Sequence, residues 1–361
     1  MHLLADISAH GLGHLAQTAP VITALQTRLP GLRLTIRSAL PRRQLARYVT
    51  GDFVHVFEAS DFGFVMHNAM DIDLAASATA YRDFHHQWHE RIDIESAWLK
   101  ANRFTAVLTN VAYLPLAGAA SAGIPCASLC SLNWGDLFIH YFAAECWAAN
   151  IHREIVSAYR DADCFLRLSP GLPMLDLDPG RRREIAPIAR LGKRARGELS
   201  RQLGIAGGYR WILLAMGGMD FRLPVESWPR VTGVSWLVPA AWRVRRDDVR
   251  AFDATDIDFA DLLASVDGVI TKPGYGIFVE AACHGIPILY MQRDDWPETP
   301  YLSEWLARHA RSCAISRSRL MKGDIIEALT QLWCTPPPAA PLATGADEAA
   351  AELLQTVLRL R

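Results

Sequence analysis

The residues best suited to chemistry lie in a glycine-rich stretch of the second half of the chain. Gly274, Tyr275 and Gly276 follow an apolar run with the length of a strand, and Glu280 lies about one turn into the helical pattern after them. Glycines let a ligand approach the backbone, and free N–H groups at a helix start bind anions. A phosphate bound there, with Glu280 on sugar hydroxyls, would make a nucleotide-sugar site. A lone glycine turn is also common in α/β domains generally.

Two cations accompany this turn. Lys272 precedes the first glycine, and Arg293 lies in the charged loop after the next strand. Either would offset negative charge on a departing diphosphate, which an enzyme without a metal must do. The alternative is an ordinary surface ion pair between Arg293 and an aspartate of its own loop.

A second glycine loop, near the N-terminus, carries two histidines. His10, Gly11, Gly13 and His14 lie in a turn that follows a short apolar strand. Ligands bind at the carboxyl ends of strands in α/β folds, and histidine can act as a general base near neutral pH. We therefore predict that His14, or else His10, takes a proton from a hydroxyl group of a second substrate, the acceptor. The alternative is that His14 only packs against or caps the helix start.

Asn133 and Asp136 follow a buried strand and are expected at the same edge of the sheet. They would orient or deprotonate an acceptor hydroxyl. A helix N-cap by Asp136 is the competing interpretation.

A metal site is not predicted. Three histidines and a glutamate gather in one helical segment, but they lack the H-E-x-x-H spacing and an evident third ligand: His85, His86, His89 and Glu90. A solvated helix face explains them better. We expect no cofactor, with a nucleotide sugar as co-substrate.

Two copies of one arrangement, a strand, a glycine turn and a helix, would position these residues. Strands are expected at His2–Ile7, Leu32–Ser38, Phe53–Phe57, Ala106–Asn110, Pro125–Leu129, Cys164–Leu168, Trp211–Ala215, Ser235–Val238, Val249–Phe252, Gly268–Thr271 and Pro287–Tyr290. Helices are expected at Leu15–Arg28, Pro41–Val49, Ala75–Ala101, Tyr113–Ala122, Gly192–Leu203, Phe259–Ser265, Ile277–His284 and Ala346–Leu360. This alternation predicts an α/β protein with two doubly wound, parallel-sheet domains.

The domain boundaries follow from composition. Residues 1–168 form the predicted N-terminal domain, and residues 169–190, rich in proline, glycine and arginine, form a linker. Residues 191–335 form the second predicted domain, and residues 346–361 a terminal helix. The family resemblance described below implies that the first domain binds the acceptor and the second domain the donor.

Charge and cysteine content narrow the function classes. The 361 residues are 51% hydrophobic and 21% charged with a net charge of −1, so the chain is globular and lacks the basic surface that nucleic-acid binding needs. The seven cysteines show no C-x-x-C spacing, which favours a reducing cytoplasm. We expect no signal peptide and no transmembrane segment, because polar and breaker residues interrupt the long apolar stretch at Phe104–Gly135. Peripheral contact with a membrane stays open.

The motifs resemble a known superfamily. Gly274-Tyr275-Gly276, Glu280 and Gly285-Ile286-Pro287 are similar to the donor-binding signature of GT-B glycosyltransferases of the MurG type. They are still closer to the glycosyltransferase-like N-terminal domain of plant L-arabinokinases. There a Lys-x-Gly-Tyr-Gly turn precedes an Arg-Arg-Asp-x-x-x-Glu loop, as Lys272 here precedes Gln292-Arg293-Asp294 and Glu298.

The resemblance implies a GT-B fold, two Rossmann-like domains that face each other across a cleft, with a C-terminal helix that returns to the first domain. It implies that Glu280 holds the donor ribose, that Gly217 and Gly218 face the donor phosphates, and that Asp294 and Glu298 contact sugar hydroxyls.

The expected activity is therefore metal-independent transfer of a sugar, UDP-linked by analogy, to an unknown acceptor, with inversion at the anomeric carbon. The Gln-rich segment of MurG-type enzymes is absent, and no kinase domain fits in the chain. A nucleotide-sugar hydrolase or epimerase, or a non-catalytic nucleotide-sugar sensor, are the alternatives.

Overall fold

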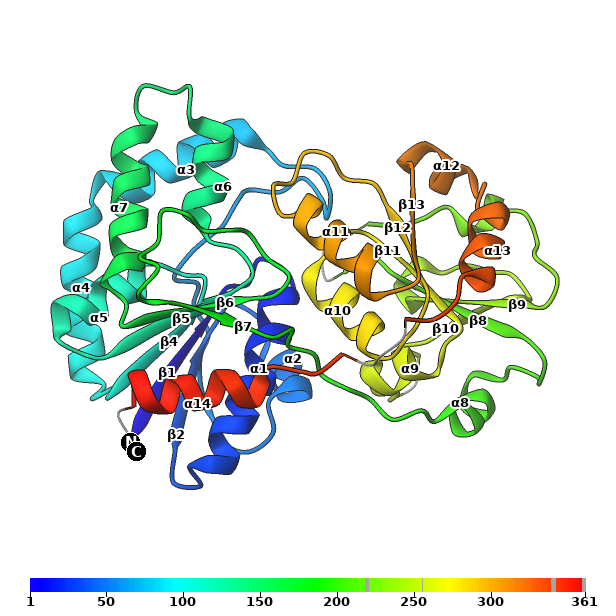
Figure 1. Cartoon of the computed structure of the whole chain (residues 1–361), viewed down its shortest axis with the longest axis horizontal. Coiled ribbons are helices and arrows are strands. Elements are labelled where there is room, and N and C mark those ends of the chain that lie inside the picture. Colours follow the sequence, from blue (N-terminus) through cyan, green and yellow to red (C-terminus); the bar gives the residue numbers. More distant parts are fainter. Residues whose placement is uncertain (218–220, 255, 339–341, 359–361) are drawn as a thin grey trace. The chain divides into compact units, whose positions relative to one another are not determined.

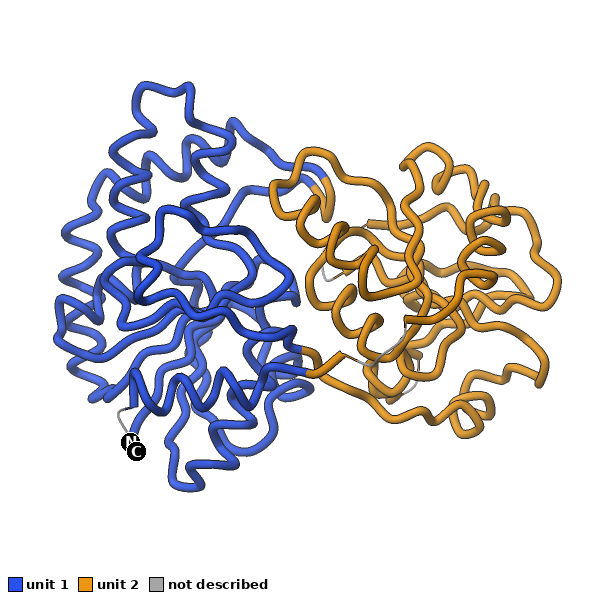
Figure 2. The backbone as a smooth tube through the Cα atoms, in the orientation of Figure 1, with its two compact units in different colours: residues 1–67, 71–188, 344–361 blue, residues 68–70, 189–343 orange. Residues whose placement is uncertain are grey.

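The computed structural model describes residues 1–217, 221–254, 256–338 and 342–358. The chain divides into two compact units (Figure 2). Unit 1 comprises residues 1–67, 71–188 and 344–361, and unit 2 comprises residues 68–70 and 189–343. Residues 169–190 were expected to link the two domains, but residues 169–188 belong to unit 1.

Unit 1 is built on a seven-stranded parallel sheet in the order β3-β2-β1-β4-β5-β6-β7 (Figure 1). Its strands are β1 (His2–Ile7), β2 (Arg33–Arg37), β3 (Val54–Val56), β4 (Ala106–Asn110), β5 (Cys126–Cys130), β6 (Cys164–Leu168) and β7 (Arg182–Ile185). Its helices are α1 (Gly13–Arg28), α2 (Arg42–Tyr48), α3 (Leu74–His86), α4 (Trp88–Ala101), α5 (Leu114–Ala122), α6 (Trp134–Phe142), α7 (Ala148–Asp161) and α14 (Ala346–Thr356).

The central strands of unit 1 are apolar and buried on both faces, as a parallel sheet covered by helices requires. Every residue of β4 and β5 is buried. On the helical side, α4 packs closely on α5 at Gly118, where a Cβ would lie 2.3 Å from Cγ of Glu95. The strand order reverses between β1 and β4, and the loops that follow these two strands meet at that point.

The terminal helix α14 lies on unit 1, which confirms the expected return of the C-terminal helix to the first domain. Arg28 of α1 pairs with Asp347 at 3.0 Å, and the Glu348 carboxylate accepts from the Ala186 N–H at 3.1 Å. Leu353 and Val357 of this segment are buried.

Unit 2 repeats the architecture with a six-stranded parallel sheet in the order β10-β9-β8-β11-β12-β13. Its strands are β8 (Arg210–Ala215), β9 (Val234–Val238), β10 (Val249–Ala251), β11 (Gly268–Thr271), β12 (Ile288–Met291) and β13 (Ser312–Ile315). Its helices are α8 (Arg196–Leu203), α9 (Phe259–Ser265), α10 (Tyr275–Cys283), α11 (Thr299–His309), α12 (Arg317–Lys322) and α13 (Ile326–Cys334), with short 3₁₀ turns η1 (Val225–Ser227) and η2 (Ala240–Trp242).

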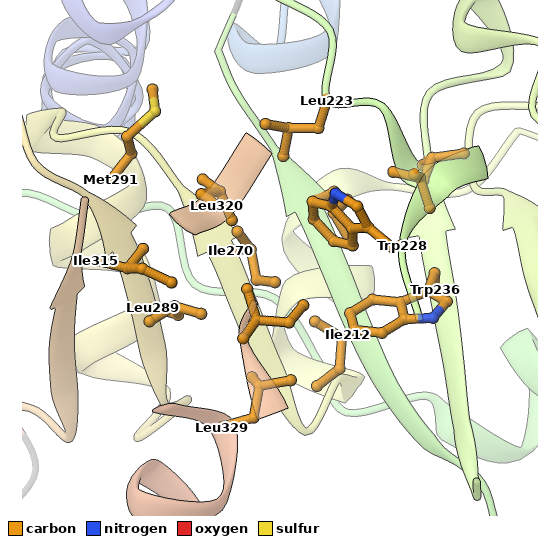
Figure 3. Close-up of a cluster of buried hydrophobic side chains, with 14 of the residues drawn as sticks. Ile212, Leu223, Trp228, Trp236, Ile270, Leu289, Met291, Ile315, Leu320 and Leu329 are labelled. Carbon is orange, nitrogen blue, oxygen red and sulfur yellow. The ribbon is translucent and has the colours of Figure 1, made fainter. Parts of the chain in front are cut away.

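One face of this second sheet carries a large apolar core (Figure 3). Ile212, Ile270 and Leu289 from three neighbouring strands pack toward Leu320 and Leu329 of the terminal helices of the unit. Trp228 and Trp236 meet edge to face, with ring centroids 5.5 Å apart. The rigid sheet that results carries the turns after β8 and β11, which meet where the strand order reverses.

Three local expectations differ from the structure. The predicted helix Ala75–Ala101 is two helices, because the backbone leaves the helical conformation at Gln87, which has φ −117° and ψ 38°. Arg182–Ile185, expected in a linker, pairs with β6 as an edge strand. Helix α10 begins at Tyr275, two residues before the predicted start.

In the described part of the chain, no helix combines the length and the apolar character that a membrane crossing requires.

Candidate active site

The first candidate site lies in unit 1, at the carboxyl ends of the neighbouring strands β1 and β4, where the strand order reverses. Asn110 is the last residue of β4 and pairs with Ile7, the last residue of β1. Helix α1 begins at Gly13, so His14 lies in its first turn. His14 is 6% exposed, and its Nδ1 lies 2.7 Å from Oδ1 of Asn110. The glycine loop after β1 and the end of β4 therefore meet through one buried hydrogen bond.

A chain of amides, in the orientation that the structure gives them, indicates which nitrogen of His14 carries the proton. Ser131 Oγ accepts from Nε2 of Gln17 at 2.9 Å, and Oε1 of Gln17 accepts from Nδ2 of Asn110 at 3.2 Å. Asn110 therefore presents its oxygen to His14, and an amide oxygen only accepts. Nδ1 of His14 is the donor, which leaves the lone pair of neutral imidazole on Nε2.

Burial also sets the charge of this imidazole. It lowers the pKa of His14 to about 4, and the hydrogen bond to Asn110 opposes this shift only in part. Asn110 is neutral, so it orients the ring without the charge with which a carboxylate would stabilise an imidazolium. His14 is consequently neutral near pH 7, as a proton acceptor must be.

Trp134 connects His14 with the other candidates of this edge. Its ring centroid lies 5.8 Å from that of His14 and 5.4 Å from that of His10. Its Nε1 donates to Oδ2 of Asp61 at 2.7 Å. Burial raises the pKa of Asp61 to about 7, against the opposing effect of the Trp134 hydrogen bond. Gly63, with φ +59°, lets this loop pass close to the His10 and Trp134 rings.

A buried ion network supports the same end of the sheet. Arg37 of β2 donates through Nε to Asp6 of β1 at 2.5 Å, and through Nη1 and Nη2 to Glu95 of α4 at 3.0 and 2.6 Å. Burial opposes the charge of Arg37, but Asp6 and Glu95 together hold its pKa above the usual range. The network fixes the end of β1 from which the glycine loop departs.

Asn133 and Asp136 have different surroundings from His14. Asn133 caps α6, its Oδ1 accepting from the Asp136 N–H at 2.8 Å, so the suggested capping role of Asp136 belongs to Asn133. Burial raises the pKa of Asp136, whose other neighbours include Asp176 and His152. Its neighbours Asn133, Asp176 and His152 differ from the partners of His14, which include Asn110 and Cys130.

The second candidate site lies in unit 2, at the carboxyl ends of the neighbouring strands β8 and β11, where the strand order reverses. Gly217, after β8, has φ +92°, and a Cβ there would lie 3.2 Å from Cε of Lys272. Gly274, at the start of α10, has extended backbone, and a Cβ there would lie 4.0 Å from Nζ of Lys272. The ammonium group is thus placed beside both glycine turns. Gly218 lies outside the described residues.

The start of α10 and Lys272 together form an electropositive site. Gly274 is the N-cap and has no side chain to cap the helix, and the start of a helix is a place where anions bind. Tyr275 and Gly276 are buried in the first turn. Burial lowers the pKa of Lys272 to about 8, Arg293 lowers it further, and Glu298 opposes the shift.

Glu280 lies further along α10 and is 7% exposed. Burial raises its pKa to about 7, while the charge and the backbone N–H of Arg190 oppose the shift. The Arg190 guanidinium in turn binds both carboxylate oxygens of Asp258 at 2.9 and 3.0 Å. The expected ribose-binding carboxylate is therefore a buried neighbour of Arg190, which pairs with the exposed Asp258.

The three remaining candidates, Arg293, Asp294 and Glu298, lie in the loop after β12 and differ in burial. Arg293 is 8% exposed, lies 4.5 Å from the Trp296 ring centroid and donates to Asp295 at 3.1 Å, which is the loop ion pair given as the alternative. Its Nη2 is buried without a hydrogen-bond partner in the described structure. Glu298 is buried, whereas Asp294 is exposed.

The helical histidines hold no metal arrangement. His85 is buried between Glu154 at 2.7 Å and the Tyr113 hydroxyl at 2.9 Å. Across the described residues, no three His, Cys, Asp or Glu side chains are grouped so that they could hold a metal ion.

The comparisons with known proteins concern the whole chain. No family model matches it. It is 24% identical over 335 residues to L-arabinokinase of Arabidopsis thaliana, a match that covers 88% of this chain and 31% of that protein. The chain thus spans about a third of the length of this curated relative.

Solved structures match over nearly the whole chain. The glycosyltransferase of kitacinnamycin superposes with a TM-score of 0.62 at 15% identity, covering 99% of this chain and 95% of that one. The chain has the GT-B fold. A Staphylococcus aureus MnaA structure with UDP gives 0.61 at 12% identity, covering 100% and 97%. A putative UDP-N-acetylglucosamine 2-epimerase from Listeria monocytogenes gives 0.54 at 14%, covering 98% and 94%.

Several residues of these two candidate sites were missed at the level of sequence. Asn110, Gln17 and Asp61 belong to unit 1, and Arg190 belongs to unit 2. Asn110 carried one usable signal, a polar residue at the carboxyl end of an apolar strand. Asp61 and Arg190 lie in segments without periodicity, so only tertiary packing brings them to the sites.

Proposed function

We propose that this GT-B chain is a glycosyltransferase that moves a sugar from a nucleotide-sugar donor, UDP-linked, to an acceptor hydroxyl without a metal ion. Unit 2 binds the donor, and unit 1 binds the acceptor and supplies the base. The observation that carries the proposal is the position of Lys272 between the Gly217 turn and the uncapped start of α10.

The donor site supplies charge where the leaving group needs it. A nucleoside diphosphate departs with negative charge, and Lys272 and the N–H groups of α10 stabilise this charge without reorganisation. Arg293, with a buried nitrogen that makes no hydrogen bond in the described structure, provides a second cation. Glu280 accepts hydrogen bonds from the ribose hydroxyls.

The base in unit 1 completes the reaction. Nε2 of His14 takes the proton of the acceptor hydroxyl, whose oxygen forms a bond to the anomeric carbon. The bond from that carbon to the diphosphate oxygen breaks, and the electron pair leaves with the nucleoside diphosphate. A single displacement of this kind inverts the anomeric carbon.

A second function is favoured by the structural similarity to the putative epimerase from Listeria monocytogenes. In a hydrolase or epimerase of this fold, cleavage of the sugar–diphosphate bond requires no acceptor hydroxyl. The neutral partner of His14, Asn110, suits a site in which the imidazole holds little positive charge. A sensor would bind the nucleotide sugar and release nothing.

One assay separates these functions. The protein is incubated with UDP-, dTDP- and GDP-linked sugars, with and without a panel of hydroxyl acceptors, and released nucleoside diphosphate is quantified. A transferase releases it only when an acceptor is present, whereas a hydrolase releases it without one. Epimerisation shows as a changed sugar in the recovered donor. Binding with neither released diphosphate nor a changed sugar in any mixture would contradict an enzyme.

Variants tie the result to the site. Lys272→Met should abolish diphosphate release and weaken nucleotide binding, because it removes the buried cation and keeps a side chain of similar length. Lys322→Met, at an exposed lysine of the same unit, is the matched control and should behave like the parent.

A further inference from the structure

The residue that follows Asn110 has an unusual backbone. Val111 has φ +72° and is fully buried. The left-handed region is unfavourable for a β-branched residue, because Cβ approaches the backbone. Of the four non-glycine residues with positive φ in the described structure, Val111 is the β-branched one; the others are Arg103, Met174 and Arg243. Surrounding contacts must therefore hold Val111 in place.

Tyr159 of α7 provides such a contact. Its hydroxyl lies 2.6 Å from the Val111 carbonyl oxygen and 3.1 Å from the Trp134 backbone nitrogen. A carbonyl only accepts and a backbone N–H only donates, so the hydroxyl donates to Val111 and accepts from Trp134. Tyr159 is 2% exposed. One hydroxyl thus joins the loop after β4 to the start of α6, which follows β5.

Both loops contact His14. The residue before Val111 is Asn110, whose side chain accepts from Nδ1 of His14 and whose carbonyl accepts from the Ser8 N–H at 3.4 Å. On the other loop, the Trp134 ring lies beside the imidazole. A shift of either loop would therefore change the position or the tautomer of His14.

From this geometry we propose that Tyr159 is a positioning residue for His14. Its hydroxyl holds Val111 in the left-handed conformation, which aims the Asn110 oxygen at Nδ1 and keeps the proton-accepting lone pair on Nε2. Tyr159 touches neither donor nor acceptor. Its effect on turnover rests on the proposed function, whereas its effect on the His14 tautomer does not.

A Tyr159→Phe variant removes only this hydroxyl. The readout is the ¹⁵N spectrum of ring-labelled histidine at pH 7.5, with the His14 signals assigned from their loss in His14→Gln. The parent should show the Nδ1–H tautomer. Tyr159→Phe should show a mixture of tautomers. Its turnover at saturation should be reduced by up to about tenfold, because misplacement by a fraction of an ångström already slows catalysis. Donor affinity should stay within about twofold, because Tyr159 lies in unit 1.

Tyr81→Phe is the matched control. Tyr81 is 1% exposed, and its hydroxyl makes no hydrogen bond in the described structure. It loses the same atom from a similarly buried ring, so it should keep both the tautomer and the turnover. A general effect of removing a buried hydroxyl would alter both variants alike and would overturn the proposal.

A second substitution tests the role of the backbone. Glycine adopts φ +72° without strain, so Val111→Gly added to Tyr159→Phe should return the His14 signals toward the Nδ1–H tautomer. If Tyr159→Phe leaves the tautomer of His14 unchanged, the proposal is wrong, whatever happens to turnover. If the parent shows no sugar transfer, the proposed function fails, while the spectra still decide the role of Tyr159.

Discussion

Oδ1 of Asn110 lies 2.7 Å from Nδ1 of His14, although 96 positions separate the two residues in the chain. The contact joins the last residue of β4 to the first turn of α1 at the point where the strand order reverses. It gives the glycine loop after β1 a neutral imidazole of known tautomer. The side chain that was a candidate base in the sequence therefore has the geometry of one.

His14→Ala should lower turnover by about 100-fold or more, because loss of a general base typically has an effect of this size. Affinity for UDP should be nearly unchanged, since His14 belongs to unit 1 and the proposed nucleotide site belongs to unit 2. Steady-state kinetics and calorimetry measure the two quantities. His10→Ala is compared in parallel, because its ring also lies beside Trp134. A His14→Ala variant that loses UDP affinity but keeps its turnover at saturation would assign the loop to the donor.

The pKa of His14 predicts a pH dependence of stability. Unfolded His14 binds a proton below its ordinary pKa of 6.5, whereas folded His14 stays neutral down to about pH 4. Between these values the unfolded state binds more protons, so stability falls as the pH falls from 6.5 to 4. The loss amounts to about 3 kcal/mol, from about 1.4 kcal/mol for each pH unit. Urea unfolding at pH 7.5 and pH 4.5 should show that His14→Gln loses less stability than the parent.

Asn110→Asp strengthens the interaction that opposes the effect of burial on the pKa of His14. A carboxylate beside the imidazole stabilises its protonated form, so the pKa of His14 should rise by about 1–3 units. Titration of the His14 ring resonances measures the shift directly. A pKa that stays near that of the parent would show that Asn110 does not face His14 in solution.

Much of the fold could be predicted because it depends on local patterns. Strands β1, β4, β6 and β11 match their expected residues, since each is a short apolar run that ends at a polar or glycine residue. Strand β7 could not be found, because Arg182–Ile185 carries three charges and joins the sheet only at its edge. Its position depends on the neighbouring strand and not on its own composition.

The sites were predictable only in part, for a related reason. His14 and Lys272 follow glycine turns, which are visible in a sequence. Asn110 becomes informative only once β4 is known to lie beside β1, and Arg190 only once it is known to lie against α10. Gly274 has φ −174°, and the left-handed glycine beside Lys272 is Gly217.

Glu280→Ala should weaken the binding of UDP and uridine about tenfold or more, the usual effect of losing hydrogen bonds to a charged group. The variant should keep its fold, checked by circular dichroism, because Arg190 retains Asp258 as a partner. Glu304→Ala removes an exposed glutamate of the same unit and serves as the control. Equal affinity of Glu280→Ala and the parent for both ligands in calorimetry would refute the ribose role.

We predict that turnover needs no divalent metal. Four D-x-D triplets occur in the chain, at residues 71–73, 161–163, 176–178 and 256–258, but the structure gives Asp73 and Asp258 other roles. Asp73 caps α3, and Asp258 caps α9 and binds Arg190. The cations Lys272 and Arg293 would take over the role of the metal. Turnover should therefore be the same with and without excess EDTA. Activity that EDTA abolishes and magnesium or manganese restores would count against this mechanism.

Lys272 should make diphosphate affinity depend on pH. Burial lowers its pKa to about 8, so the free protein loses this positive charge as the pH rises through 8. A bound diphosphate favours the charged form, so the affinity for UDP should be constant below about pH 7.5 and fall by up to about tenfold per pH unit above pH 8. Uridine, which lacks the phosphates, should show no such decrease. Lys272→Met should bind UDP weakly at every pH, and Lys272→Arg should lose the pH dependence, because a guanidinium stays charged throughout this range. Calorimetry from pH 6.5 to 9.5 on these variants, with Lys322→Met as the control, measures each expectation. The same decrease in the parent and in Lys272→Met would place the titrating group elsewhere, and the diphosphate would then not be held by Lys272.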